Sequence, residues 1–144
     1  MDMQSLLASI PYLKTHGLEV DIEADGYVQA RMPYQKALTN HVGILHAAAI
    51  YALAETTAGV ASSVIIPGGA AIVLLRSGQV KYTRKAEGDL VAKACARTAV
   101  ADKARTDFAA AARADAEINV AVTDAEGQIV FEGSFDYALR PLRS

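Results

Sequence analysis

Residues 39–66, TNHVGILHAAAIYALAETTAGVASSVII, decide the fold of this chain. The run is too long for a single strand and is rich in alanine, the residue with the highest helix propensity. The sequence Pro67-Gly68-Gly69 follows directly and cannot continue a helix. The segment therefore predicts a helix that begins near Leu45 and ends at about Ser63.

The charge pattern around this helix indicates where it lies. Between Val42 and Leu75 the only formally charged side chain is Glu55. The run is long enough to cross a bilayer, but it holds Glu55 and several other polar side chains, and alanine contributes little to membrane insertion. We therefore expect no membrane span. A helix without a polar face must be enclosed by other elements, so we expect a central, buried helix.

Alternating apolar and polar residues predict strands on both sides of the helix. Two precede it, Leu18–Ala24 and Tyr27–Met32, joined by the hairpin turn Asp25-Gly26, and residues 4–10 form a short apolar helix or turn. Four more are expected over residues 71–84, 89–100, 116–124 and 128–139, with a short helical insertion over residues 101–115. The order β-β-α-β-β-β-β predicts an α+β fold with one long helix against an antiparallel sheet, in a single domain over residues 1–144.

Composition excludes several classes of protein. The chain has 144 residues, 52% of them hydrophobic, with a net charge of -2, which argues against disorder and against broad binding to nucleic acid. One cysteine allows no intramolecular disulfide, and the first residues lack a secretory signal, so we expect a cytoplasmic protein. Alanine accounts for 29 residues, and a core of such small side chains buries little area, which favours stabilisation by subunit contacts.

Four residues in and before the helix are candidates for chemistry: Asn40, Gly43, His46 and Glu55. Asn40 and Gly43 lie in the turn that enters the helix, where unpaired N–H groups and the helix dipole favour a developing negative charge. His46 and Glu55 are nine residues apart, which places them on opposite faces of the helix and about 13 Å apart. If both serve one reaction, they come from different subunits, so the spacing predicts a homodimer.

Each of these residues also has a structural interpretation. Glu55 could reach water or bond a neighbouring threonine such as Thr56. In the middle of an apolar helix, however, its carboxylate would be desolvated and its pKa raised, and such groups persist mainly where they are paired or functional. We therefore favour a functional role for Glu55. His46 fits a helix cap as well as a catalytic role, and Asn40 is slightly better explained as a turn residue.

The pattern of these residues resembles a known family. Asn40-x-x-Gly43-x-x-His46, followed by Glu55 in Ala-Leu-Ala-Glu-Thr, is similar to the signature of hotdog-fold acyl-CoA thioesterases, especially the PaaI-like (phenylacetyl-CoA thioesterase-like) group and its uncharacterised relatives. The similarity covers residues 17–139. It implies a helix wrapped by an antiparallel sheet, a dimer in which two sheets join, and two active sites at the dimer interface.

The chain departs from the family pattern in two places. Ala47 and Ala48 stand where the family often has glycine, which keeps the backbone N–H donors but narrows the space for a substrate. The insertion around Phe108 is longer than the usual hairpin turn. The sequence leaves its role open, and covering the acyl channel is the one function that suggests itself.

The resemblance implies hydrolysis of an acyl-CoA thioester to a free acid and coenzyme A. Backbone N–H groups around Gly43 and Ala47 would polarise the thioester carbonyl. Glu55 of the other subunit would act as a general base on water or as a nucleophile. Asn40 and His46 would orient the water or the carbonyl.

Coenzyme A is part of the substrate, so neither a cofactor nor a metal is expected. Its phosphates could be bound by a small basic cluster of Lys81, Arg84 and Lys85, in which Arg84 is the strongest candidate. The dimers could pair further into a homotetramer, as a dimer of dimers.

Other functions fit the sequence less well. Acyl-thioester dehydratases and hydratases share the fold, but the chain has neither a His-Phe-Pro-Gly sequence nor an Asp-x-x-x-x-His pattern at the helix entry. A non-catalytic acyl-CoA-binding protein, with Glu55 as a buried structural acid, stays open. A ligand-sensing repressor would need a DNA-binding helix-turn-helix, which the sequence lacks. Cys95 lies in an alternating strand without a neighbouring base, which is typical of a core thiol.

Overall fold

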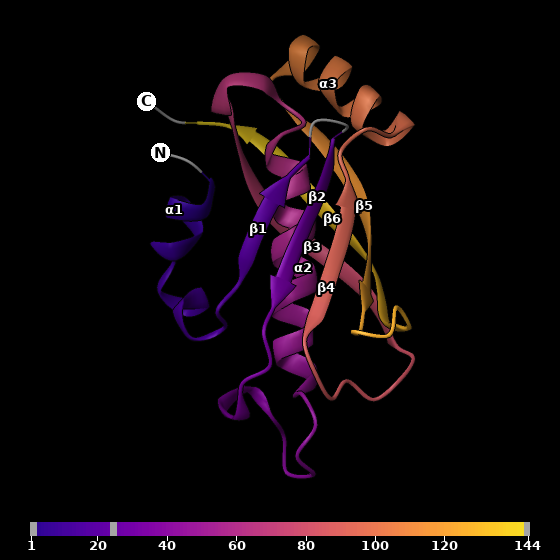
Figure 1. Ribbon diagram of the computed structural model, residues 1–144. Helices are drawn as coiled ribbons and strands as arrows, with labels where there is room; N and C mark the ends of the chain where they lie inside the picture. Colours follow the sequence, from indigo (N-terminus) through magenta and orange to yellow (C-terminus); the bar gives the residue numbers. More distant parts are fainter. Residues whose placement is uncertain (1–2, 24–25, 143–144) are drawn as a thin grey trace.

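A curved antiparallel sheet wraps the central helix α2 in the computed structural model, which describes residues 3–23 and 26–142 (Figure 1). The α+β order is the one that the sequence predicts. Short 3-10 turns η1 (Pro11–Thr15), η2 (Lys36–Leu38) and η3 (Pro67–Gly69) join some elements. The helices and strands are α1 (Met3–Ala8), β1 (Glu19–Ile22), β2 (Tyr27–Met32), α2 (Ala47–Ser63), β3 (Ala71–Tyr82), β4 (Leu90–Cys95), α3 (Ala99–Ala111), β5 (Ala114–Thr123) and β6 (Ile129–Pro141).

The helix α2 begins at Ala47, two residues later than predicted. The chain before it is extended, because the Leu45 N–H donates to the Ala86 carbonyl at 2.8 Å and Leu45 forms a β-bridge with Thr39. Most side chains of α2 are buried, including several alanines that let the sheet pack closely. None of the described helices is both long and apolar enough to cross a membrane.

The six strands are ordered β1-β2-β4-β5-β6-β3, so β1 and β3 form the two edges. The predicted first hairpin is confirmed, with Glu19 opposite Arg31 and Ile22 opposite Val28. Its turn contains Gly26 at φ +87°, a backbone conformation that glycine adopts without strain. Asp25, the other residue of the predicted turn, lies outside the described residues.

The predicted strand over residues 89–100 is too long. It ends at Cys95, and the insertion that follows forms α3 from Ala99, two residues before its predicted start. Thr98 caps this helix, because its side chain accepts a hydrogen bond from the Ala101 N–H at 3.1 Å. α3 packs against β5 at the end of the sheet where α2 ends (Figure 1).

Candidate active site

A groove of about 1040 Å³ runs along the face of α2 that the sheet leaves uncovered. Small residues of α2 form its floor, namely Ala48, Ala52, Gly59 and Ser63, and Glu55 lies among them. β3 forms one wall, and α1 with η1 forms the other. The predicted enclosure of the helix is therefore incomplete, and Glu55 lies on the open face.

Glu55 is half-buried and paired with a tyrosine from a strand far away in the sequence. The Tyr137 hydroxyl donates to the backbone oxygen of Glu55 at 3.0 Å and also lies 3.4 Å from its Oε1. Burial raises the pKa of Glu55 above its ordinary value, and the Tyr137 hydrogen bond partly offsets that rise. Burial and the neighbouring carboxylate raise the pKa of Tyr137, so its hydroxyl stays a proton donor at neutral pH.

The start of α2 presents polar groups to solvent. His46 is the N-cap, and its Nδ1 accepts a hydrogen bond from the Ala48 N–H at 2.9 Å. In the neutral imidazole the proton is then on Nε2, which can donate to another molecule. The Tyr82 hydroxyl donates to the Ala47 carbonyl at 2.8 Å and ties the helix start to β3. Within the described part of the chain, the Ala47 N–H donates to no protein acceptor.

Asn40 and Gly43 shape the turn before the helix. The Asn40 side-chain oxygen accepts from the Val42 N–H at 3.0 Å and from the Ile44 N–H at 3.3 Å. The Gly43 N–H donates to the Asn40 carbonyl at 3.1 Å, and Gly43 has φ +83°. The Gly43 N–H is therefore engaged within the turn, whereas Ala47 is exposed and its N–H donates to no acceptor among the described residues.

His46 and Glu55 do not share a site within one chain. The residues that line the groove include Ala48 and Glu55 but not His46, which lies at the exposed start of the helix. This arrangement agrees with the nine-residue spacing.

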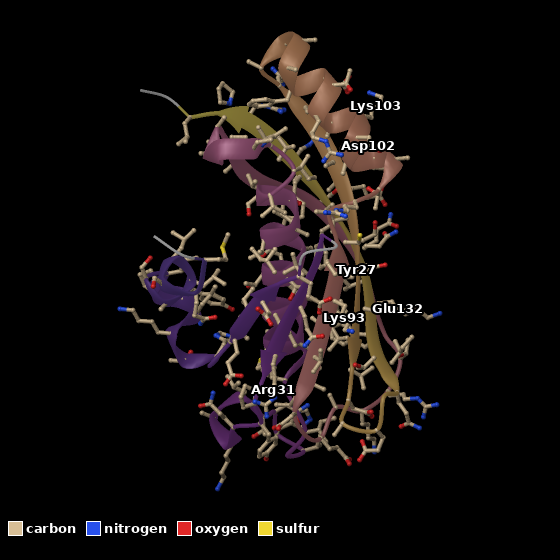
Figure 2. All side chains as sticks on the ribbon, turned by 45° about the horizontal axis from the view of Figure 1, so that its top comes forward. Tyr27, Arg31, Lys93, Asp102, Lys103 and Glu132 are labelled. Carbon is tan, nitrogen blue, oxygen red and sulfur yellow. The ribbon has the colours of Figure 1, made fainter. Side chains whose placement is uncertain are left out.

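The structure divides the predicted basic cluster. Arg84 and Lys85 line an open hollow together with Glu87, Asp124 and Glu126. Their loop adjoins the start of α2 through the hydrogen bond to the Ala86 carbonyl. Lys81 instead lines a separate hollow on the outer face of the sheet, which also includes Tyr27, Lys93 and Glu132 (Figure 2).

The insertion that forms α3 does not cover the groove of its own chain. No described residue of α3 lines the groove, and Asp102 and Lys103 of α3 project into solvent (Figure 2). α3 packs on β5 through its small side chains Ala101 and Ala104 instead. The groove is lined by α1 and η1, which the sequence offered only as a short apolar helix or turn.

Tyr137 is a further part of the site that the sequence did not single out. It is separated from Glu55 by 82 positions and belongs to no motif. Only the pairing of β6 across the sheet shows that it reaches α2.

Comparison with known proteins places the chain in a family. Residues 3–139 match the family described as "Domain of unknown function (DUF4442)". The chain belongs to this family. A DUF4442 assignment carries no activity, but it agrees with the resemblance to a family with uncharacterised relatives.

This DUF4442 chain is similar to proteins that carry a functional name or have a solved structure. The Halobacterium salinarum protein "Putative esterase VNG_1336C" is 35% identical over 103 residues, 65% of this chain and 67% of that protein. PA5026 from Pseudomonas aeruginosa, named a "Probable Thioesterase", covers 99% of this chain and 97% of its own, with a TM-score of 0.83 and 23% identity. The match to thioesterase HI1161 from Haemophilus influenzae covers 100% of this chain and 94% of HI1161, with a TM-score of 0.78 and 16% identity. These likenesses show that the fold is the hotdog fold.

Proposed function

We propose that this protein hydrolyses acyl-CoA thioesters and that each active site is built from two copies of the chain. The observation that carries the proposal is Glu55, a carboxylate with a raised pKa and the one formal charge among the described residues that line a mostly apolar groove. The esterase and thioesterase names of similar proteins agree with this reaction class.

The edge strand β3 supports the two-chain site. It has twelve residues, and among the described strands it pairs only with β6. The strand also carries several half-exposed apolar side chains, and a long apolar edge strand of this kind favours pairing with another strand. These are Ile72, Leu74, Leu75, Val80 and Tyr82. Antiparallel pairing of β3 with the β3 of a second copy would place the two α2 helices side by side in opposite directions, so that the start of one approaches the middle of the other.

In the proposed reaction, the Ala47 N–H and the His46 Nε2–H of one chain bind the thioester oxygen, and Glu55 of the other acts at the carbonyl carbon. As a general base, Glu55 takes a proton from water while the water oxygen forms its bond to that carbon. The C–S bond then breaks, and the departing sulfur takes the proton from Glu55, which yields the free acid and the coenzyme A thiol. As a nucleophile, Glu55 would instead bond to that carbon as the C–S bond breaks and the coenzyme A thiolate leaves. Water then hydrolyses the resulting anhydride, which releases the acid, restores the Glu55 carboxylate and supplies the proton for the thiol. Both routes need Glu55 ionised.

Arg84 and Lys85 remain our candidates for the phosphates of coenzyme A. Their loop adjoins the start of α2, where the thioester would lie. Lys81 faces the outer side of the sheet and is the weaker candidate.

A panel of acyl-CoAs with detection of the released thiol tests the proposal. Glu55→Gln should lower kcat about 100- to 10,000-fold, the usual contribution of a general base. His46→Ser should lower it as well, while serine keeps a cap on the helix. Glu132→Gln, at an exposed glutamate on the outer face, should change nothing. Absence of thiol release from every acyl-CoA by the wild-type protein would contradict the proposal and favour the acyl-CoA-binding alternative.

A further inference from the structure

The α1–η1 segment, residues 3–15, forms the wall of the groove opposite β3. It lies beside β1 and faces α2 (Figure 1). The contributing side chains are Met3, Leu6, Leu7, Ile10, Tyr12 and Leu13. All but Tyr12 are purely apolar, so this wall offers almost no hydrogen bonds to a ligand.

The segment is fastened to β1 and leaves apolar surface facing the groove. The Gln4 side chain donates to the Leu18 carbonyl at 3.1 Å and accepts from the Val20 N–H at 2.9 Å. Leu6 and Tyr12 stay 46% and 66% exposed, although both line the groove. An apolar surface of this kind, next to a half-buried carboxylate, is typical of a ligand pocket.

The dimensions and charge of the groove restrict the ligand. Among the described residues that line it, Glu55 alone carries a formal charge, so a charged acyl group would lose hydration without gaining a partner. The groove volume of about 1040 Å³ is much larger than an acetyl group needs. β3 forms the opposite wall of the groove. A second chain paired with β3 would therefore lie on that side and would not displace the α1–η1 wall.

We propose that the α1–η1 segment determines acyl specificity by binding the tail of an uncharged aliphatic acyl chain of medium to long length. This inference rests on the proposed site at Glu55. Each methylene that the wall removes from water is worth ~0.8 kcal/mol, which corresponds to about a fourfold rise in kcat/KM. The preference should therefore grow with chain length until the wall is covered.

The test compares acetyl-, hexanoyl-, decanoyl- and palmitoyl-CoA on the wild-type protein and on Leu6→Gln, with Tyr12→Gln as a second variant. Both positions are half-exposed or more, so folding should survive, which circular dichroism checks. We expect the decanoyl-to-acetyl ratio of kcat/KM to fall at least about fivefold in each variant. A decanoyl-length substrate that ends in a carboxylate should be hydrolysed at least about 100-fold less efficiently than decanoyl-CoA by the wild-type protein.

Val100→Gln on α3 is the matched control, because Val100 is 43% exposed and lies outside the groove. It should leave the ratio unchanged. Dissociation constants of the same acyl-CoAs for Glu55→Gln protein, with and without Leu6→Gln, give the chain-length dependence without turnover. If the wild-type protein hydrolyses no acyl-CoA but binding still strengthens with chain length, the proposed function is overturned and the role of the α1–η1 segment is not. A ratio that does not change in Leu6→Gln and Tyr12→Gln, or a change of oligomeric mass in both, would overturn the role of the segment.

Discussion

The two edges of the sheet differ in how they end. The edge strand β1 has four residues, and the Gln4 side chain bonds the backbone at Leu18 and Val20, so the α1–η1 segment covers this side. The other edge, β3, has twelve residues, carries several half-exposed apolar side chains and pairs on its free side with no described segment. Proteins usually shorten or cover an edge strand to avoid unwanted pairing. The contrast teaches that this chain covers one edge itself, and in the proposed dimer a second copy covers the other.

The largest expected effect comes from charging the β3 edge. Val80→Lys places a cation at a side chain that is 37% exposed in one chain and that a paired strand would bury. Dimers should dissociate, as light scattering would show. The thioesterase rate should fall at least about 100-fold, because the donors at the helix start would be lost from each site.

Ile22→Lys on β1 is the control for this variant, since Ile22 is 41% exposed on the opposite edge. It should keep both the mass of the dimer and the rate. Equal behaviour of the two lysine variants would remove the distinction between the edges.

The next effect concerns Tyr137, on the β3 side of the groove. Its hydrogen bond lowers the pKa of Glu55, so Tyr137→Phe should raise that pKa further. Glu55 works ionised, so activity falls as pH decreases through its pKa. The acid limb of kcat/KM should therefore lie above pH 4.5, the ordinary value for glutamate, and should move to higher pH in the variant. A limb at the same pH in both proteins would show that Tyr137 does not tune Glu55.

Gly59, in the floor of the groove, lacks a side chain, which should widen the groove and lower the stability of α2. A Cβ there would lie 3.6 Å from the Tyr137 hydroxyl, which is an ordinary contact. Gly59→Ala should stabilise the helix by about 1 kcal/mol in chemical denaturation and lower kcat/KM by up to about tenfold, because the groove narrows beside Glu55. Greater stability with unchanged kinetics would mean that the glycine does not serve the substrate.

The smallest effect is expected on the covered side. Gln4→Ala removes two hydrogen bonds that hold α1 to β1. Because these groups are near solvent, the free energy of unfolding should fall by only about 1 kcal/mol. Amide hydrogen exchange should increase in α1 and at Val20 but not in β3. Faster exchange across the whole sheet would show that the α1–η1 segment contributes to the stability of the entire sheet.

Local signals predicted most of the fold. The long alanine-rich run before Pro67 predicted α2, the alternation around Gly26 predicted the first hairpin, and the isolated charge of Glu55 identified the centre of the candidate site. What the sequence did not show depends on distant contacts. Tyr137 reaches Glu55 only because β6 crosses the sheet. The helix start moved to Ala47 because of a bond to Ala86 on another loop.

The role of the two peripheral helices was harder to predict for the same reason. α1 has six residues and α3 has thirteen, and nothing in either sequence indicates which face of the fold the helix covers. Small buried residues hold α3 against β5, whereas Gln4 ties α1 to β1 beside the groove. Position along the chain gave no indication of either contact.

The proposed active site is shared between two chains, and mixing two inactive variants tests this sharing directly. Glu55→Gln and His46→Ser homodimers each lack one group at both sites. In a heterodimer of the two, one site combines the intact Glu55 with the intact His46. After unfolding and joint refolding of equal amounts, we predict recovery of about a quarter of the wild-type rate, because half of the dimers are mixed and each has one complete site. A mixture no more active than its separate components would contradict the shared site.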